Sequence, residues 1–261
     1  MNQANIAVIG AGLAGLACAR RLHASGHRVV VLDKGRSPGG RLATRRAEGV
    51  SFDHGAQYFT AREQVFRDWL GEARQAGAVA GWAPRWPGGE QETAELHVGV
   101  PGMNSIARQL AQGLELRPET RITQMTRTEQ AWTLTDDRGG GTAGFDFVVL
   151  ALPAPQAAGL LPQGSPLVAP LGERVMAPCW SVMAAFAEPL QVPADASWID
   201  DLVLPWLARN SSKPGRTGLD AWVLHAAADW SRAELESDPA RIREALLARM
   251  AVRLDISLPA P

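Results

Sequence analysis

The sequence predicts an α/β fold, with a Rossmann-type dinucleotide-binding domain and a second domain built of sheet and helices. Three observations predict it: a glycine-spaced turn between two apolar strands near the N-terminus, a further apolar strand over residues 145–152, and three strand-like segments between residues 179 and 228. The 261 residues are 46% hydrophobic and 20% charged, as is typical of a globular protein with a large core.

The first strand, helix and strand follow one another directly. Residues 6–9 form a short apolar run, typical of a buried parallel strand. The pattern then predicts a helix over residues 13–25, ended by Gly26, and a second strand over residues 28–32. Such a βαβ unit is the setting in which a glycine-rich turn binds a dinucleotide. A glycine-rich turn without a ligand is the alternative.

The turn itself has the spacing G-x-G-x-x-G, formed by Gly10, Gly12 and Gly15. Gly10 permits the tight turn, Gly12 lets the backbone approach a pyrophosphate, and Gly15 lets helix and strand pack closely. Because a helix N-terminus presents free N–H groups and a positive dipole end, we expect the backbone of Leu13 and Ala14 to face the phosphates.

An acidic residue, Asp33, ends the second predicted strand. A carboxylate at this position accepts hydrogen bonds from a ribose, and it repels a 2′-phosphate. The neighbouring Lys34 and Arg36 could neutralise a 2′-phosphate, but we expect them to face solvent or the pyrophosphate. The motif alone does not distinguish NAD from FAD, since both contain ADP.

A second glycine pair follows in Gly39-Gly40-Arg41-Leu42. Glycines let this loop lie against a bulky ligand, and Arg41 could form a bidentate pair with a phosphate. Residues 1–50 hold eight Lys and Arg against two acidic residues, whereas the whole chain has a net charge of −1. This local excess suits a polyanionic cofactor better than nucleic acid, which requires a wider basic face. A solvated arginine loop is the alternative.

Two segments, DKGRSPGGRLATRR (33–46) and FDHGAQYFTAR (52–62), resemble the renalase family of flavoproteins. These proteins are relatives of the monoamine oxidases within the glutathione-reductase-like class. Softer similarity continues at residues 98–111, 145–156 and 221–231, so the resemblance spans most of the chain. It implies FAD as the cofactor and a glutathione-reductase-like FAD-binding domain.

The resemblance also implies which residues contact the cofactor. It places residues 53–59 along the flavin ring, with Gln57 and Tyr58 facing the substrate. Together with the residues already named, the expected FAD contacts are Leu42, His54, Gly55, Ala56, Gln57, Ile122, Leu152 and Pro153.

Tyr58 and His225 are the candidate catalytic residues. Tyr58 is the single tyrosine of the chain, and a buried hydroxyl requires a partner; an ordinary core aromatic is the alternative. His225 lies within a predicted strand and could donate a hydrogen bond to a substrate, although a satisfied core histidine explains it at least as well. Four tryptophans could wall an aromatic pocket: Trp82, Trp86, Trp206 and Trp222.

We expect a discontinuous FAD-binding domain, residues 1–62 and 100–160, and a substrate domain, residues 63–99 and 161–258. Asn104 is predicted to cap a helix over residues 105–113, and Asp238 to cap a helix that runs to about residue 250. Recurring prolines indicate an extended connection over residues 161–178.

The sequence disfavours several classes of protein, namely metal-binding, disulfide-rich, membrane-spanning and secreted proteins. The histidines and the two cysteines, Cys18 and Cys179, show neither metal-ligand spacing nor a disulfide framework. No apolar run reaches the length of a membrane span, and the N-terminus lacks the pattern of a signal peptide. We therefore expect a cytoplasmic protein without a metal, a membrane span or a nucleic-acid partner.

The resemblance implies an FAD-dependent oxidase that takes a hydride from an isomer of NAD(P)H and passes the electrons to dioxygen, giving hydrogen peroxide. An amine oxidase, or an FAD- or nucleotide-binding protein without turnover, are the alternatives. Relatives of this class usually end with a strand, a Gly-Asp turn and a helix that close the cofactor site. The sequence ends in ISLPAP instead, so we expect either a fragment or a family member without that segment.

Overall fold

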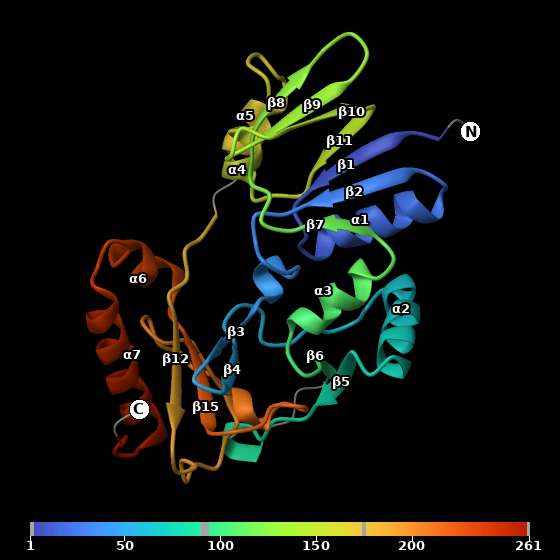
Figure 1. Cartoon of the computed structure of the whole chain (residues 1–261). Helices are drawn as coiled ribbons and strands as arrows, with labels where there is room; N and C mark the ends of the chain where they lie inside the picture. Colours follow the sequence, from blue (N-terminus) through green and yellow to red (C-terminus); the bar gives the residue numbers. More distant parts are fainter. Residues whose placement is uncertain (1–2, 90–93, 174–175, 260–261) are drawn as a thin grey trace. The chain divides into compact units, whose positions relative to one another are not determined.

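The computed structural model describes residues 3–89, 94–173 and 176–259 (Figure 1). The chain forms two compact units. Unit 1 contains residues 1–42 and 106–176, and unit 2 contains residues 43–105 and 177–261. The predicted α/β fold class is confirmed.

Unit 1 is built on a parallel sheet of order β11-β1-β2-β7. Its strands are β1 (Asn5–Ile9), β2 (Arg28–Leu32), β7 (Glu115–Arg117) and β11 (Phe147–Leu150). A second, antiparallel sheet has the order β10-β9-β8, with β8 (Ile122–Arg127), β9 (Trp132–Asp136) and β10 (Gly141–Phe145). The helical segments are α1 (Leu13–Ala24), η1 (Gly40–Leu42), most of α3 (Asn104–Ala111), α4 (Ala154–Ala158) and α5 (Val168–Gly172).

The core of unit 1 follows from the strand pattern. Ala7 and Ile9 point to the same face of β1, because side chains alternate along a strand, and both are buried. They pack with Leu32 and with Met125 and Leu134 of the antiparallel sheet. The strand predicted over 145–152 exists as β11, but it is an edge strand, and its Phe147 is 60% exposed rather than buried.

Unit 2 contains an antiparallel sheet of order β12-β15-β14-β13 and two hairpins, β3-β4 and β5-β6. The strands are β3 (Thr44–Ala47), β4 (Val50–Asp53), β5 (Val79–Trp82), β6 (Leu96–Gly99), β12 (Ser181–Phe186), β13 (Ala196–Trp198), β14 (Trp206–Arg209) and β15 (Asp220–His225). The helical segments are α2 (Gln64–Gln75), η2 (Pro87–Gly89), η3 (Asn210–Ser212), α6 (Ala228–Ala233) and α7 (Pro239–Leu254).

Helix α7 lies along β12 in Figure 1 and closes the core of unit 2. Its buried residues Ile242, Leu246 and Met250 pack with Phe186 and Trp222 of the sheet. Asp238 caps the helix by accepting a hydrogen bond from the N–H of Ala240, as predicted.

Three local predictions are wrong. Asn104 is the first residue of α3 and not its cap: its backbone N–H donates to the hydroxyl of Thr44, and among the described residues its buried Oδ1 has no partner. The connection predicted to be extended over 161–178 contains α5. The three predicted C-terminal strands are four, because Pro205 and the turn before it separate β13 from β14.

The compact units also differ from the predicted domain bounds. Residues 43–62 were predicted to belong with the nucleotide-binding segments, but they lie in unit 2. The reason is packing: Val50 and Phe52 of β4 share a buried cluster with Ala221 and Val223 of β15. Which unit binds cofactor and which binds substrate stays a prediction.

Candidate functional site

The glycine turn of unit 1 has the geometry that a pyrophosphate requires. A Cβ added at Gly10, whose φ is 109°, would lie 2.5 Å from the carbonyl oxygen of Ala151, and one added at Gly15 would lie 1.9 Å from that of Gly10. These two glycines are therefore required by packing. A Cβ on Gly12 would meet nothing within 4 Å, so the backbone at the start of α1 is open to a ligand.

The second glycine pair lies directly against this turn. The N–H of Gly39 donates to the carbonyl of Ala11 at 2.9 Å, and Gly39 forms a bridge with Gly12. A Cβ on Gly40, at φ 54°, would approach the Cα of Gly12 to 3.3 Å. Only glycines let these two segments approach so closely. As a result, the loop brings the backbone next to Arg41 against the glycine turn, where phosphate binding is predicted.

Asp33 is bonded within this turn. One carboxylate oxygen accepts from the N–H of Ala11 at 2.6 Å, and the other accepts from that of Gly35 at 2.7 Å. Each carboxylate oxygen offers two acceptor positions, so one on each remains for a ribose hydroxyl. The half-buried carboxylate of Asp33 thus positions the turn and still has acceptor positions for the hydroxyl groups of a ribose.

The remaining predicted cofactor residues of unit 1 occupy different settings. Lys34 and Arg41 are exposed, whereas Leu42 is buried. Leu152 lies beside the glycine turn, since its Cδ2 is 3.2 Å from the Cβ position of Gly10, and Pro153 begins α4. Ile122 packs against the core of unit 1.

Unit 2 contains a buried ionic network that the sequence analysis missed. Asp53, at the end of β4, is fully buried and forms ion pairs with Lys213, at 3.5 Å, and with Arg216. Its other oxygen accepts from the hydroxyl of Thr44 at 2.8 Å and from the N–H of Met103 at 2.9 Å. One carboxylate therefore joins several segments of unit 2.

Lys213 is as completely enclosed as its partner. Its amine donates to Oε1 of Gln57 at 3.0 Å and to Oδ1 of Asn210 at 3.2 Å, besides Asp53, so all three donors have acceptors. The ammonium also lies 5.4 Å from the ring centroid of Trp82, within the range of a cation–π contact. The signal in the sequence was NSSKPGR (210–216), a polar segment that reads as an ordinary surface turn.

Burial and charge shift the pKa values of this network. Burial lowers the pKa of Lys213, and Arg216 lowers it further, while Asp53 raises it; the result is a pKa of about 8 instead of 10.5. Burial raises the pKa of Asp53, but the charges of Lys213 and Arg216 outweigh it, so this pKa lies below its ordinary value. Asp53 is therefore ionised at neutral pH.

The predicted polar residues around this network are bonded to one another. The side-chain amide of Gln57 is buried and donates to the carbonyls of Asp53 and Gly55, so Gln57 does not face a substrate as expected. The side-chain oxygen of Gln57 is also engaged, because it accepts a hydrogen bond from the amine of Lys213. Nε2 of His225 lies 3.0 Å from the carbonyl of His54, and burial, more than any other cause, lowers the pKa of His225. Ala56 is half-buried.

His225 is consequently neutral at neutral pH and donates its Nε2–H to His54. It is a satisfied histidine, the simpler of the two alternatives. The Nδ1 atom of His54 is buried and has no hydrogen-bond partner among the described residues.

Tyr58 lies in a cluster of tryptophans. Its ring centroid is 6.1 Å from that of Trp82 and 5.8 Å from that of Trp206, and Trp206 also contacts Trp86 and Trp198. Three of the four tryptophans named from the sequence thus gather near Tyr58. Trp222 does not: it is fully buried in the core, and its indole N–H donates to Asp220.

Two absences hold for residues 3–89, 94–173 and 176–259. No group of three or more His, Cys, Asp or Glu side chains is placed to hold a metal ion. None of the helices within these ranges combines the length and apolarity that a bilayer crossing requires.

The turn of unit 1 defines the class of the protein as a dinucleotide-binding α/β protein. A family model described as NAD(P)-binding Rossmann-like domain matches residues 8–73, and one described as flavin containing amine oxidoreductase matches residues 82–251, well over half of the chain. The chain therefore belongs to the family of flavin-containing amine oxidoreductases, and this membership confirms FAD as the cofactor.

Curated relatives match the chain over short segments. A 4,4'-diapophytoene desaturase of Staphylococcus haemolyticus is 48% identical over 50 residues, which are 19% of this chain and 10% of that protein. A phytoene desaturase of Cereibacter sphaeroides is 40% identical over 93 residues, 33% of this chain and 18% of that protein. The matched segments thus span less than a fifth of either relative.

Solved structures match over nearly the whole chain. A candidate protoporphyrinogen oxidase from Exiguobacterium sp. 255-15 has a TM-score of 0.77 at 14% identity, and the match covers 99% of this chain and 85% of that one. Putrescine oxidase bound to putrescine has a TM-score of 0.74 at 13% identity, covering 97% of this chain and 82% of that one. At such identities the likeness concerns the fold alone.

Replacing the buried carboxylate should destabilise unit 2. Asp53→Asn leaves Lys213 and Arg216 buried without an opposite charge, and breaking a buried pair in this way costs about 3–5 kcal/mol. Denaturant unfolding followed by tryptophan fluorescence measures the change. Asp229→Asn is the control, because Asp229 is 96% exposed and its pair with Arg232 lies on the surface. Equal stability of both variants would contradict the role of Asp53.

Stability should also depend on the titration of Lys213. Between pH 8 and 10.5 the unfolded chain retains the proton that the folded Lys213 has lost, so this residue makes the free energy of unfolding rise with pH across that window. We expect the difference in free energy of unfolding between wild type and Lys213→Met to shift in favour of the wild type as the pH is raised. A difference that is constant with pH would show an unshifted pKa.

Proposed function

We propose that the protein is an FAD-dependent oxidase of renalase type that acts in the cytoplasm on a dihydronicotinamide. The substrate is an isomer of NAD(P)H that carries its hydride at an unusual ring position, and it leaves as NAD(P)⁺. When bound, FAD would supply the redox chemistry: it would accept the hydride and, with one proton taken from solvent, pass the electron pair to dioxygen to give hydrogen peroxide.

The fit of unit 1 to the cofactor supports this proposal most strongly. Gly12 leaves open backbone at the N-terminus of α1, where the helix dipole favours a pyrophosphate. Arg41 is exposed beside it and has no ion pair or hydrogen bond within the described residues, so its guanidinium is available for a phosphate. Asp33 retains acceptor positions for the ribose of the ADP half.

The aromatic cluster of unit 2 supports a flat ring as substrate. Tyr58 is half-buried and packs against Trp82 and Trp206, which are themselves buried, so Tyr58 is the ring among these three that can stack on a nicotinamide ring. In this reading Tyr58 contacts the substrate. His225 acts as a positioning residue. Its Nε2–H is bonded to the backbone carbonyl of His54, four residues before Tyr58, and so helps to hold the segment that carries Tyr58.

The charges near this cluster favour a dihydronicotinamide over an amine. The buried network next to Trp82 contains two cations, Lys213 and Arg216, and one carboxylate, Asp53. A protonated amine would approach an excess of like charge, which is unfavourable at short range. A nucleotide with negatively charged phosphates would not.

Amine oxidation is the second candidate function. The family model carries that name, and the fold resembles that of putrescine oxidase. A third candidate is FAD binding without turnover. It predicts a bound flavin that neither class of donor reduces.

Turnover measurements separate these candidates. Hydrogen peroxide release should be observed with isomeric dihydronicotinamide dinucleotides and not with primary amines or polyamines. Tyr58→Leu should lower kcat/KM for the isomers by up to about tenfold, since an aromatic contact contributes about 0.5–1.5 kcal/mol.

Phe147→Leu is the control variant, because Phe147 is an exposed aromatic of unit 1. Its kcat/KM should equal that of the wild type. Peroxide release with amines alone would establish the second candidate and refute the proposal.

A further inference from the structure

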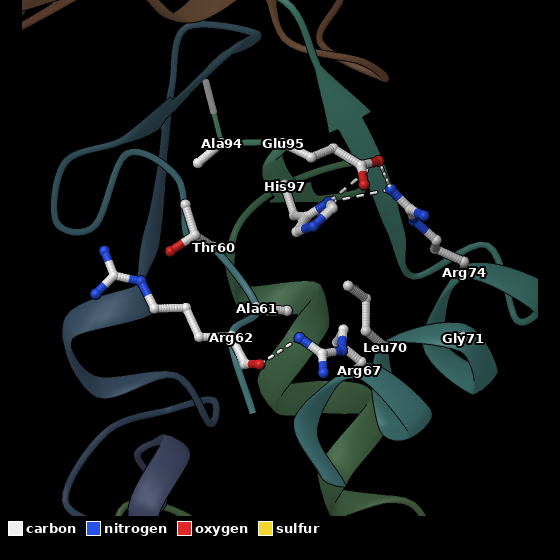
Figure 2. A pocket seen from close by; sticks show the side chains of 10 residues that line it. All are labelled: Thr60, Ala61, Arg62, Arg67, Leu70, Gly71, Arg74, Ala94, Glu95 and His97. Atoms are coloured by element: carbon white, nitrogen blue, oxygen red, sulfur yellow. Dashed lines mark hydrogen bonds and ion pairs between the residues drawn. The ribbon is translucent and has the colours of Figure 1, made fainter. Parts of the chain in front are cut away.

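A pocket of about 300 Å³ lies in unit 2 apart from the ionic network. Figure 2 shows it between the segment that precedes α2, the helix itself and β6. In this view the side chain of Arg62 extends past Thr60 and away from Arg67 and Leu70, and Arg74 lies on the other side. The volume is at the lower end for a ligand site and suits a small group or one part of a larger ligand.

Helix α2 presents one face to this pocket. Arg67, Leu70, Gly71 and Arg74 all line it, and their spacing of three, four and seven residues places them on a single helix face. The acidic residues of α2, Asp68 and Glu72, do not line the pocket. The helix thus supplies two guanidinium groups without an accompanying carboxylate.

Two of the three arginines that line the pocket, Arg62 and Arg67, have no carboxylate partner among the described residues. Arg67 donates only to neutral oxygens, those of the Arg62 backbone and the Gln64 side chain, and Arg62 has no ion pair among the described residues. Arg74 pairs with Glu95. The pocket therefore carries an excess of positive charge.

His97 does not alter this balance at neutral pH. Burial, followed by the charge of Arg74, lowers its pKa, and the opposing effect of Glu95 does not restore it. Its Nδ1 lies 3.1 Å from a guanidinium nitrogen of Arg74 and therefore accepts, which places the ring proton on Nε2. Arg74 is thus held in position by two acceptors.

Gly71 is an independent sign that this space is kept open. A glycine inside a helix costs about 1 kcal/mol relative to alanine. A Cβ at Gly71 would meet nothing within 4 Å, so packing within the chain does not require glycine here. A larger side chain at this position would enter the pocket from its helix face.

We propose that this pocket binds a phosphate group. The guanidinium groups of Arg67 and Arg74 on α2 can donate to several oxygens of a phosphate, and the Thr60 hydroxyl is a further donor. The residues of this site differ from those of the glycine turn of unit 1, to which the FAD pyrophosphate is assigned.

The phosphate of the nicotinamide nucleotide is the source that the chain geometry favours, and this part of the inference rests on the proposed function. Tyr58 and Arg62 are four residues apart, which corresponds to at most about 14 Å of extended chain. Phe59, which lies between them, exchanges both backbone hydrogen bonds with His97 at 2.9 Å. His97 lines the pocket, so the segment that contains Tyr58 runs alongside it. A nicotinamide ring on the aromatic cluster would thus place its own phosphate within reach of the arginines. A free phosphate is the other source.

Binding of inorganic phosphate to the FAD-loaded protein tests the site, since FAD then occupies the turn of unit 1. Calorimetric titration should give saturable binding at about millimolar concentration, weakened at high ionic strength. Arg67→Gln and Gly71→Leu should each weaken it roughly tenfold, the loss expected when one charge-assisted bond is removed or blocked. Arg243→Gln, an exposed arginine of α7, is the matched control.

Absence of saturable binding, or equal affinity in wild type, Arg67→Gln and Gly71→Leu, would overturn the proposal. Melting curves establish that both variants are folded. If the protein does not retain FAD, the same titrations on the purified chain still decide the question, because they compare variants of the pocket alone.

Kinetics identify the source of the phosphate. With isomeric dihydronicotinamide mononucleotide, Arg67→Gln should raise KM about tenfold and leave kcat unchanged. With the corresponding riboside, which lacks the phosphate, the variant should equal the wild type. If KM is unchanged for both substrates while phosphate binding is lost, the site binds a free phosphate instead of the substrate. Absence of turnover with either would refute the proposed function but not the site.

Discussion

Unit 2 depends on the charge of one buried carboxylate. Asp53 lies between two buried cations, and without it the desolvation of Lys213 and Arg216 would be uncompensated. Its contacts join β4 to the segment before α3 and to the turn that follows η3. Through Lys213 the same network fixes Gln57 and borders Trp82. The residues beside Tyr58 are therefore held by electrostatics as well as by packing.

In unit 1 the corresponding constraint is steric. Two glycine-containing segments meet at Gly12 and Gly39, and a side chain at Gly10, Gly15 or Gly40 would meet backbone atoms. The arrangement leaves backbone N–H groups open and brings Arg41 beside them. The buried cations of unit 2 disfavour a positively charged substrate, and the arginines of the α2 pocket favour a phosphate. The last two features support the proposed nucleotide substrate over an amine, whereas the glycine turn, which is assigned to FAD, does not distinguish the two.

The sequence predicted what is local and missed what is distant. The glycine turn, α1 and Asp33 lie within one βαβ unit, and their spacing alone determines their role. The two cationic partners of Asp53 follow it by about 160 residues, and no periodicity connects a polar turn such as NSSKPGR with a strand so far away. Trp222 was grouped with the other tryptophans because composition does not reveal which face of a strand is buried. Asn104 failed as a cap because α3 begins one residue earlier than predicted, so that Asn104 is the first residue of the helix.

The measurement that tests the central claim most directly is the FAD affinity of the wild type beside that of Gly12→Ala. A methyl group at Gly12 meets nothing within the chain, so the variant should fold as well as the wild type. It would, however, occupy the space of the pyrophosphate. The account predicts that the wild type binds FAD and that Gly12→Ala, with the same melting temperature, binds it at least about tenfold more weakly. A wild type that cannot be loaded with FAD, or equal affinity in both proteins, would contradict it.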